Sequence, residues 1–462
     1  MPYLFKKPLS KRQGFFVLNC QVIIGNDPFL SHFCIMKKIA RLSILFFILQ
    51  VFFVLWGKDI FGQYLNPYGL FIAYFGLAYC YFISIFHTDF TTFSFDKFNI
   101  SSKLYALALS LALFALCIPA IRSLFSQYLI PDVIKYSDVL PLIIKQYDLF
   151  ALGETPYQAI AFPFHTAYPA YMPFHWLPIG ISRFFGKDPR WAGLFLLVLV
   201  CLLFVFFIAN KHKNSLFTHL LILLPTIIVY VFIKKAGSDI AITFETVIAA
   251  YYFLLAIALM QKNFVMVIIG IILCLLSRYT LVFWLPLFFL LLLFNKGFLK
   301  TVLSLGVIVV AVFLVFVYPF LLKNPSLLVD SLAYHNNAAI ADWSEHKYSF
   351  EWGVYFGNSI DFIVKGTPSH KVFIARIIQA STMLFLLFFG LFLYRKNKSR
   401  ASFYDILLGM LYATIIGFYM LGPFAFRYYM LGPLFISLVL LARILLAEDR
   451  GEASRVSQES NG

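Results

Sequence analysis

The sequence predicts an all-α protein that crosses a membrane about twelve times. Hydrophobic residues make up 61% of the chain and charged residues only 13%, whereas a soluble domain carries roughly 25% charged residues. Apolar runs of about 20 residues, the length that crosses roughly 30 Å of hydrocarbon, recur from residue 39 to residue 447. We find no separate soluble domain and no internal repeat between these runs.

The two ends of the chain depart from this pattern. Residues 1–36 are mixed in composition and lack the layout of a signal peptide. The Met-Lys-Lys sequence at 36–38 is typical of the start of a membrane protein. We therefore interpret residues 1–36 as a disordered or wrongly assigned N-terminal extension, and residues 37–447 as the transmembrane domain. The polar tail 448–462 is expected to be disordered in the cytoplasm.

Ten apolar runs are each long enough to form one transmembrane helix. They are 39–56, 68–86, 104–121, 191–209, 216–234, 239–260, 301–322, 373–394, 402–421 and 428–447. Between 263 and 295 a further apolar stretch is interrupted by Ser-Arg-Tyr-Thr at 277–280. This stretch forms either one long tilted helix or two short helices, 264–276 and 281–294, that turn at Arg278.

The basic residues favour two short helices at this place, because cytoplasmic loops carry an excess of Lys and Arg. With about twelve helices, the basic cluster at 395–400 lies inside, and Lys234 and Lys235 form the one clearly basic short loop outside. With one helix fewer, the 395–400 cluster would lie outside. We therefore expect both termini in the cytoplasm and both long loops, 122–190 and 321–372, on the outer side of the membrane.

The formal net charge of +16 does not indicate a nucleic-acid partner. The Lys and Arg residues gather in short loops between apolar runs, as expected for orientation in a membrane, and no nucleic-acid-binding motif is present. Four of the six cysteines lie inside apolar runs, and no CxxC pattern is found. The sequence therefore predicts no disulfide framework, no metal site and no cofactor.

The first outer loop contains a predicted amphipathic helix. Ser137 can cap a helix that runs to about Phe150, with Pro141 in its first turn. We expect this helix to lie in the plane of the interface, which places the Asp138 carboxylate near the boundary between water and lipid. Alternatively, Asp138 is only a first-turn acid that complements the helix dipole.

Aromatic residues and prolines then fill residues 168–178. This segment is too short and too rich in proline to span the bilayer. Its side chains, with His175 and Trp176 among them, suit a wall for an apolar chain, or equally an aromatic belt at the interface.

Three short motifs follow one another in this loop. They are Tyr-Ser-Asp-Val at 136–139, Gly-Glu-Thr-Pro-Tyr at 153–157 and Trp-Leu-Pro at 176–178. In their order and spacing, the chain resembles the integral-membrane glycosyltransferases of the GT-C superfamily. The resemblance is best to uncharacterised bacterial members of the polyprenyl-phosphate-sugar-dependent mannosyl- and arabinofuranosyltransferase-like branch. It covers residues 37–447 in layout, but its specific residues lie mainly in 131–190.

This resemblance implies an enzyme of the bacterial inner membrane. The donor would be a polyprenyl-phosphate sugar, the acceptor a hydroxyl group of a glycan, lipid or protein, and no cofactor or metal would be required. An acid of the first outer loop is the catalytic base in the superfamily, and Asp138 holds the matching position. Asp132 is the substitute, because the tandem acid that is common in relatives is replaced here by Ser137 and Asp138.

A departing phosphate needs cations, and three side chains are candidates: Arg278, Arg427 and Lys235. Arg278 is expected below the membrane surface, where a charge usually faces a cavity. The alternative for Arg278 is an ion pair with Asp239 or Glu245. The alternative for Lys235 is that it extends its ammonium group to the interface.

Aromatic and histidine side chains of the outer regions are the expected contacts for the sugar and its lipid. These candidates are Tyr157, His175, Trp176, His335, Trp343 and Tyr428. Trp343 lies beside acids and hydrogen-bonding groups, so we expect it to serve as a platform for the sugar ring.

Two other functions remain open. An O-antigen ligase or polymerase also has about twelve spans, but it relies on Arg and His in a late outer loop, and 321–372 contains no Arg. A transporter or flippase of lipid-linked sugars would have internal repeats and several intramembrane charges. Only Glu245 and Arg278 clearly qualify as such charges in the sequence.

Overall fold

The computed structural model describes residues 28–87, 100–163, 165–169, 171–209, 216–346 and 349–459. Over these residues the chain is almost entirely helical, and the two strands it contains are two residues long each. Eight helical segments in the described part are long and apolar enough to cross a membrane, judged by length and composition. The prediction of an all-α protein built from many apolar helices is therefore confirmed.

Twelve apolar helices overlap the runs predicted from the sequence. The longer ones are α1 (Pro28–Phe52), α2 (Lys58–His87), α3 (Ile100–Gln127), α8 (Arg190–Ala209), α9 (Leu216–Ile242), α13 (Phe298–Val312), α17 (Pro368–Asn397), α18 (Phe403–Met420) and α19 (Leu431–Glu459). The shorter ones are α10 (Glu245–Met260), α11 (Phe264–Leu275) and α12 (Leu285–Lys296). The helices α1 and α2 are joined by a π-helical turn, η1 (Phe53–Gly57), and pack against each other.

The interrupted apolar stretch forms two short helices, as the basic residues favoured. Arg278 has an extended backbone between α11 and a 3-10 turn, η2 (Tyr279–Phe283), and α12 follows. The Arg278 side chain bonds Tyr419 at the end of α18, whereas Trp284 bonds the carbonyl oxygen of Leu407 near the start of α18. The chain therefore runs back along α18 after Arg278.

Burial separates central helices from peripheral ones. In α18 and in the Arg427–Leu446 segment, 94% of the apolar window is buried inside the protein, against 17% in Phe298–Leu321. The segment Phe298–Leu321 consists of α13 and a π-helix, η3 (Phe313–Leu321). Its exposed surface is apolar, with Val302, Leu303 and Val309 among the exposed side chains, which suits contact with lipid.

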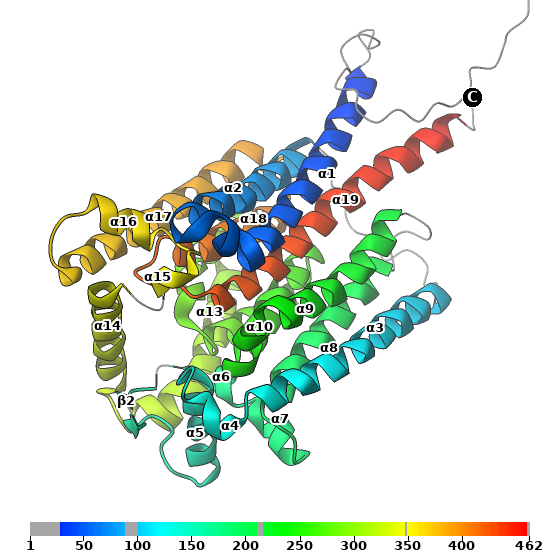
Figure 1. Ribbon diagram of the computed structural model, residues 1–462. Helices are drawn as coiled ribbons and strands as arrows, with labels where there is room; N and C mark the ends of the chain where they lie inside the picture. The colour runs from blue at the N-terminus through cyan, green and yellow to red at the C-terminus, as the bar shows by residue number, and fades with distance from the viewer. Residues whose placement is uncertain are drawn as a thin grey trace, which may run out of the picture.

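Residues 122–190, which the sequence predicts on the outer side, are called the first outer region. They lie at the ends of the helices opposite the C-terminal end of α19 (Figure 1). The region contains α4 (Ile130–Val133), α5 (Val139–Ala151), β1 (Ile160–Ala161), β2 (Thr166–Ala167), α6 (Pro173–Trp176) and α7 (Ile179–Phe184). The predicted amphipathic helix is present as α5. Gly153, which ends it with φ +77°, occupies a backbone conformation that favours glycine.

The sequence predicts that α5 lies in the plane of the interface, and in the structure protein covers two of its sides. One side, with Leu140 and Ile143, belongs to the main core. The other side, with Leu142 and Leu149, packs against Ile160 of β1 and its neighbours. The helix is therefore held inside the outer region.

The second outer region is folded rather than a loop. It consists of α14 (Leu327–Glu345), α15 (Ser349–Trp352) and α16 (Gly357–Ile363). A small core around Trp343 and Phe350 joins these helices to α17. The peptide group of Gly353 accepts a hydrogen bond of 2.8 Å from Asn66 of α2, so this region is fixed to the turn between α1 and α2.

Candidate functional site

The Asp138 carboxylate is presented at the start of α5. Asp138 is the residue before the first helical position, and it is Ser137, through Oγ, that accepts the hydrogen bond from the backbone N–H of Val139. The Asp138 side chain is therefore not used as a helix cap. It is one-third exposed, and its Oδ2 lies 2.9 Å from Nε2 of His165.

A short hairpin brings His165 to this carboxylate. The strands β1 and β2 pair in antiparallel fashion, and the backbone N–H of Phe162 donates to the carbonyl oxygen of His165 at 2.8 Å. The sequence did not predict this pair. The two residues are 27 positions apart, and strands of two residues leave no alternation that could signal the hairpin.

The charges of Asp138 and Arg278 both affect the pKa values of two side chains, His335 and Tyr171. Burial lowers the pKa of His335, the negative charge of Asp138 raises it, and the positive charge of Arg278 lowers it further. Burial raises the pKa of Tyr171, an effect that Asp138 strengthens and Arg278 opposes. The charges of Asp138 and Arg278 therefore have opposite effects on the pKa values of the same two side chains, Tyr171 and His335.

Arg278 is held by a buried acid. Its Nη1 donates to Glu245 Oε2 at 3.0 Å and to the Tyr419 hydroxyl at 3.2 Å, its Nη2 also donates to Glu245, and its guanidinium lies 4.6 Å from the Tyr429 ring centroid. The structure therefore has the ion pair that the sequence analysis left as the alternative to phosphate binding. Binding of a phosphate by Arg278 stays a prediction: Glu245 and Tyr419 take three of its N–H groups, and Nε makes no hydrogen bond to a described residue.

Arg427 makes a second pair of the same kind. Its Nε and Nη2 donate to the two oxygens of Asp239 at 2.8 and 3.1 Å, and its guanidinium lies 4.5 Å from the Trp352 ring centroid. The Asp239 side chain is 3% exposed and that of Arg427 is 15% exposed. Arg427 thus reaches the surface of the protein, whereas its partner does not.

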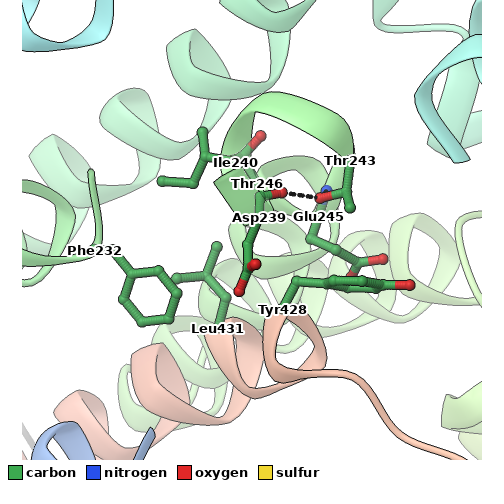
Figure 2. Close-up of a pocket in the computed structure, with 8 residues that line it drawn as sticks. All are labelled: Phe232, Asp239, Ile240, Thr243, Glu245, Thr246, Tyr428 and Leu431. Atoms are coloured by element: carbon green, nitrogen blue, oxygen red, sulfur yellow. Dashed lines mark hydrogen bonds between the residues drawn. The ribbon is translucent and has the colours of Figure 1, made fainter. Parts of the chain in front are cut away.

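A narrow pocket lies between the two acids (Figure 2). Its walls are Phe232, Asp239, Ile240, Thr243, Glu245, Thr246, Tyr428 and Leu431. Its walls are too close together to admit a water molecule. Asp138 is not one of its walls, so any ligand that reaches both Asp138 and this pocket must move the side chains between them.

The side chain of His175 is completely buried between Tyr171 and Phe244. Its ring is edge-on to Tyr171 and stacked on Phe244, with centroid distances of 4.8 and 6.2 Å. Neither ring nitrogen makes a hydrogen bond of good geometry to a described residue. Burial and the positive charge of Arg278 lower the pKa of His175 well below its usual value, so the ring is neutral at pH 7.

Two predicted aromatic contacts, Tyr157 and Trp176, lie in a closed aromatic cluster. The Tyr157 hydroxyl donates to the carbonyl oxygen of Tyr171 at 3.0 Å, and Trp176 donates to the Tyr157 hydroxyl at 3.5 Å. Both rings also contact Phe320 of η3. Both rings are buried, so neither has an accessible face on which a sugar could stack.

The expectation that Trp343 is a platform for the sugar is wrong. Its side chain is 1% exposed within the core of the second outer region, and its indole N–H donates to the carbonyl oxygen of Pro423. A buried ring with its donor already used cannot stack on a sugar that arrives from water.

Asp132 and Lys235 lie on the surface. Asp132 is nearly half exposed and pairs with Lys135, which lies one turn further along the chain, at 2.6 Å. Lys235 is exposed near the end of α9, and its ammonium lies 5.6 Å from the centroid of the Trp56 ring. Of the two predicted acids, Asp138 therefore has the histidine partner and the electrostatic contact with Tyr171 and His335.

Buried charges are more numerous than the sequence suggested. Besides the pairs of Arg278 and Arg427, the Arg443 guanidinium of α19 bonds Asp405 of α18 at 3.0 Å, and both side chains are almost fully buried. Among the described residues, no group of three or more His, Cys, Asp or Glu side chains could hold a metal ion. No family model, curated protein or solved structure matches the chain.

Proposed function

We propose that this protein is a membrane glycosyltransferase that moves a sugar from a polyprenyl-phosphate donor to an acceptor hydroxyl group at the outer face of a bacterial inner membrane. The observation that carries the proposal is the accessible Asp138 carboxylate. Its Oδ2 lies 2.9 Å from Nε2 of His165, and its charge acts on Tyr171 and His335, as the charge of Arg278 also does. An accessible carboxylate with a histidine partner suits a reaction in which a base removes the proton of an attacking hydroxyl group.

The reaction needs one base. Asp138 takes the proton of the acceptor hydroxyl, whose oxygen forms a bond to the anomeric carbon of the donor sugar. The bond from that carbon to the phosphate oxygen breaks, and its electron pair leaves with the polyprenyl phosphate. A positioned base contributes about 10²–10⁴-fold to such a step.

The proposed topology has about twelve transmembrane helices and places both termini in the cytoplasm. Support comes from α1 and α2, which fold back on each other, and from α11 and α12, which reverse at Arg278. With these reversals, the regions around α5 and α14 lie on the outer side. Asp138 is then on the side where lipid-linked sugars made of polyprenyl phosphate would be used.

The experiment that tests the proposal is a transfer assay on Asp138→Asn. The purified protein is incubated with a panel of radiolabelled polyprenyl-phosphate sugars and membrane acceptors. We expect the rate to fall at least about 10²-fold, because the amide cannot take the proton. The matched control is Asp148→Asn, another partly exposed acid of α5, which pairs with Arg183 at 3.1 Å.

The control should keep wild-type transfer, and both variants should keep the thermal unfolding midpoint of the parent. Transfer at the wild-type rate by Asp138→Asn would contradict the proposed role of this residue. Absence of transfer by the parent with every donor of the panel would count against the enzyme itself.

The buried charges favour one second candidate, a transporter of lipid-linked sugars. Ionisable residues inside the membrane often mark a substrate pathway, and here α9, α10 and α18 each contribute a buried acid. An experiment with the same polyprenyl-phosphate sugars on one side of a proteoliposome distinguishes a transporter from a glycosyltransferase. A transporter would move the lipid across the bilayer without any transfer of the sugar.

A further inference from the structure

One face of α14 lies against the loop that follows β2, and Figure 1 shows β2 at one end of this helix. The hydroxyl group of Ser331 donates to the carbonyl oxygen of Pro169 at 3.0 Å. Three residues further along α14, the centroid of the Tyr334 ring lies 6.0 Å from that of the Tyr168 ring. Residues three or four positions apart share one face of a helix. Ser331, Tyr334 and His335 therefore lie on the face of α14 that is turned toward the first outer region.

Tyr168 and Tyr334, which we call the outer tyrosine pair, are held in place but not covered. Tyr334 is partly buried, because it packs on the apolar cluster that contains Leu142 of α5. Tyr168 is 39% exposed. The pair thus differs from the buried rings of Tyr157 and Trp176, because it keeps aromatic surface that a ligand can reach from water.

The outer tyrosine pair lies beside the proposed base. The backbone N–H of Leu142 donates to the carbonyl oxygen of Asp138 at 2.8 Å, so Asp138 precedes by one turn a residue of the cluster on which Tyr334 packs. Phe162 packs on the same cluster, and its ring centroid lies 5.6 Å from that of His165, the partner of Asp138. Burial raises the pKa of Tyr334 to about 12, and the negative charge of Asp138 adds to this effect. Asp138 and the pair therefore belong to one surface.

The groups on this surface match a saccharide. A sugar ring has an apolar face of C–H groups and hydroxyl groups around its edge. A tyrosine ring offers an apolar face on which such a ring can stack, together with a hydroxyl group for hydrogen bonds. Asn337 is exposed one turn beyond Tyr334 on α14, and its amide has both donors and an acceptor for sugar hydroxyl groups. A lipid alcohol would use the apolar faces of the rings but not these polar groups.

We infer that the outer tyrosine pair is the acceptor subsite and that the acceptor is a saccharide. The acceptor ring stacks on Tyr168 from the aqueous side, and its hydroxyl group nearest to Asp138 gives up its proton to that carboxylate and bonds to the donor sugar. The inference rests on the proposed function for this reaction, whereas binding of a saccharide to the pair can be measured without it.

Binding of neutral trisaccharides to the full-length protein tests this subsite. The protein is placed in phosphatidylcholine nanodiscs, and saturation-transfer NMR is recorded during titration with maltotriose, chitotriose or mannotriose. We expect binding of at least one of them, with the strongest saturation at ring C–H protons. Tyr168→Ala should bind this sugar about tenfold more weakly, because the stacked ring is lost. Tyr168→Phe keeps the ring and should bind as the parent does.

The matched control is Tyr64→Ala. Tyr64 is an exposed tyrosine of α2, outside both outer regions, and its removal should leave binding unchanged. The inference fails if the parent binds none of the trisaccharides, if Tyr168→Ala binds them as the parent does, or if Tyr64→Ala weakens binding equally. Binding of octanol, or of an uncharged peptide that contains Ser and Thr, in place of every trisaccharide would replace the saccharide by a lipid or protein acceptor.

Kinetics separate a failure of this subsite from a failure of the proposed function. With the trisaccharide that binds as acceptor, Tyr168→Ala should raise the KM for the acceptor about tenfold and leave the KM for the lipid-linked donor unchanged. Binding that depends on Tyr168 without any transfer by the parent would overturn the enzyme and leave the subsite. Transfer by Tyr168→Ala with an unchanged acceptor KM would overturn the subsite and leave the enzyme.

Discussion

The pair formed by Asp138 and His165 gives the candidate site its chemistry, yet the sequence predicts only one of its members. Asp138 follows from a helix start in the first outer loop, where Ser137 and Pro141 mark the first turn. His165 does not, because its position depends on a hairpin of two-residue strands and on the packing of α5 beneath it. Local patterns identify groups on one element, whereas a pair between elements needs the tertiary fold.

His165 positions Asp138 in the proposed reaction, and its removal should lower the turnover rate. We expect His165→Ala to reduce kcat about tenfold, because a charge-assisted hydrogen bond contributes about 1.5–3 kcal/mol. His165→Gln should recover part of this loss, since its amide can still donate to Oδ2. The measurement is kcat and KM for sugar transfer, with His370→Ala, an exposed histidine at the start of α17, as control.

KM should stay near the parent value in both His165 variants. If Ala and Gln at this position lower kcat equally, the hydrogen bond is not what matters. If His370→Ala has the same effect, the loss is unspecific.

Asp342 gives the second outer region a dependence on pH. Burial raises its pKa from the usual 3.8 to about 6, although hydrogen bonds from Ser349 act in the opposite direction. The folded protein therefore binds a proton between pH 4 and 6 that the unfolded chain releases. Stability from this residue is highest below about pH 4 and falls as the pH rises to about 6, by no more than about 3 kcal/mol.

The measurement is the midpoint of thermal unfolding between pH 4 and 7, for the parent and for Asp342→Asn. As the pH rises over this range, the unfolding midpoint of Asp342→Asn should increase relative to that of the parent. Asp361 has the opposite sign, because hydrogen bonds from Lys371 and His346 outweigh burial and lower its pKa. Asp361 is unchanged in both proteins, so its effect cancels, and a constant difference would contradict the assignment to Asp342.

At the scale of elements, the sequence predicts which segments are helical better than which of their faces are covered. The amphipathic pattern of residues 137–150 correctly predicts α5. It cannot predict that β1 and β2 cover the side of α5 opposite the core. In the same way, residues 327–363 form three helices, and the apolar side chains that hold them together lie too far apart in the sequence to indicate one core.

Gly353 is the position at which the second outer region is most sensitive to a small change. Its φ of +57° is unfavourable for other residues, and a Cβ there would lie 2.7 Å from Cα of Gln63. Gly353→Ala should therefore lower the free energy of unfolding by about 1–3 kcal/mol.

Gly306→Ala is the matched control, because it lies within α13 and a Cβ there meets no atom within 4 Å. This control should be neutral or slightly stabilising, since alanine favours a helix by about 1 kcal/mol over glycine. The measurement is thermal unfolding in detergent. Equal stability of the two variants would show that the contact with α2 can relax.

For the whole molecule, hydropathy predicts membrane insertion but not which helices are central. The segment Phe298–Leu321 has a mean hydropathy of 2.8 and is mostly exposed, whereas Phe403–Met420 has 1.5 and is almost fully buried. The reason is that lipid accepts only apolar side chains, while a central helix carries charges that pair with its neighbours. The charged Asp405 lowers the mean hydropathy of α18. Its ion pair with Arg443 of α19 holds α18 in the centre of the protein.

The proposed orientation can be tested at two exposed positions. In a topology of about twelve spans, Glu154 after α5 lies outside and Lys398 after α17 lies inside. A membrane-impermeant maleimide added to intact spheroplasts should label Glu154→Cys but should label Lys398→Cys only after the membrane is opened. The parent protein gives the background, and its Cys80, Cys117 and Cys201 are buried. Labelling of Lys398→Cys in intact spheroplasts would mean that 264–294 crosses the membrane once. Asp138 and Lys398 would then share the outer side, and the assignment of basic loops to the cytoplasm would fail.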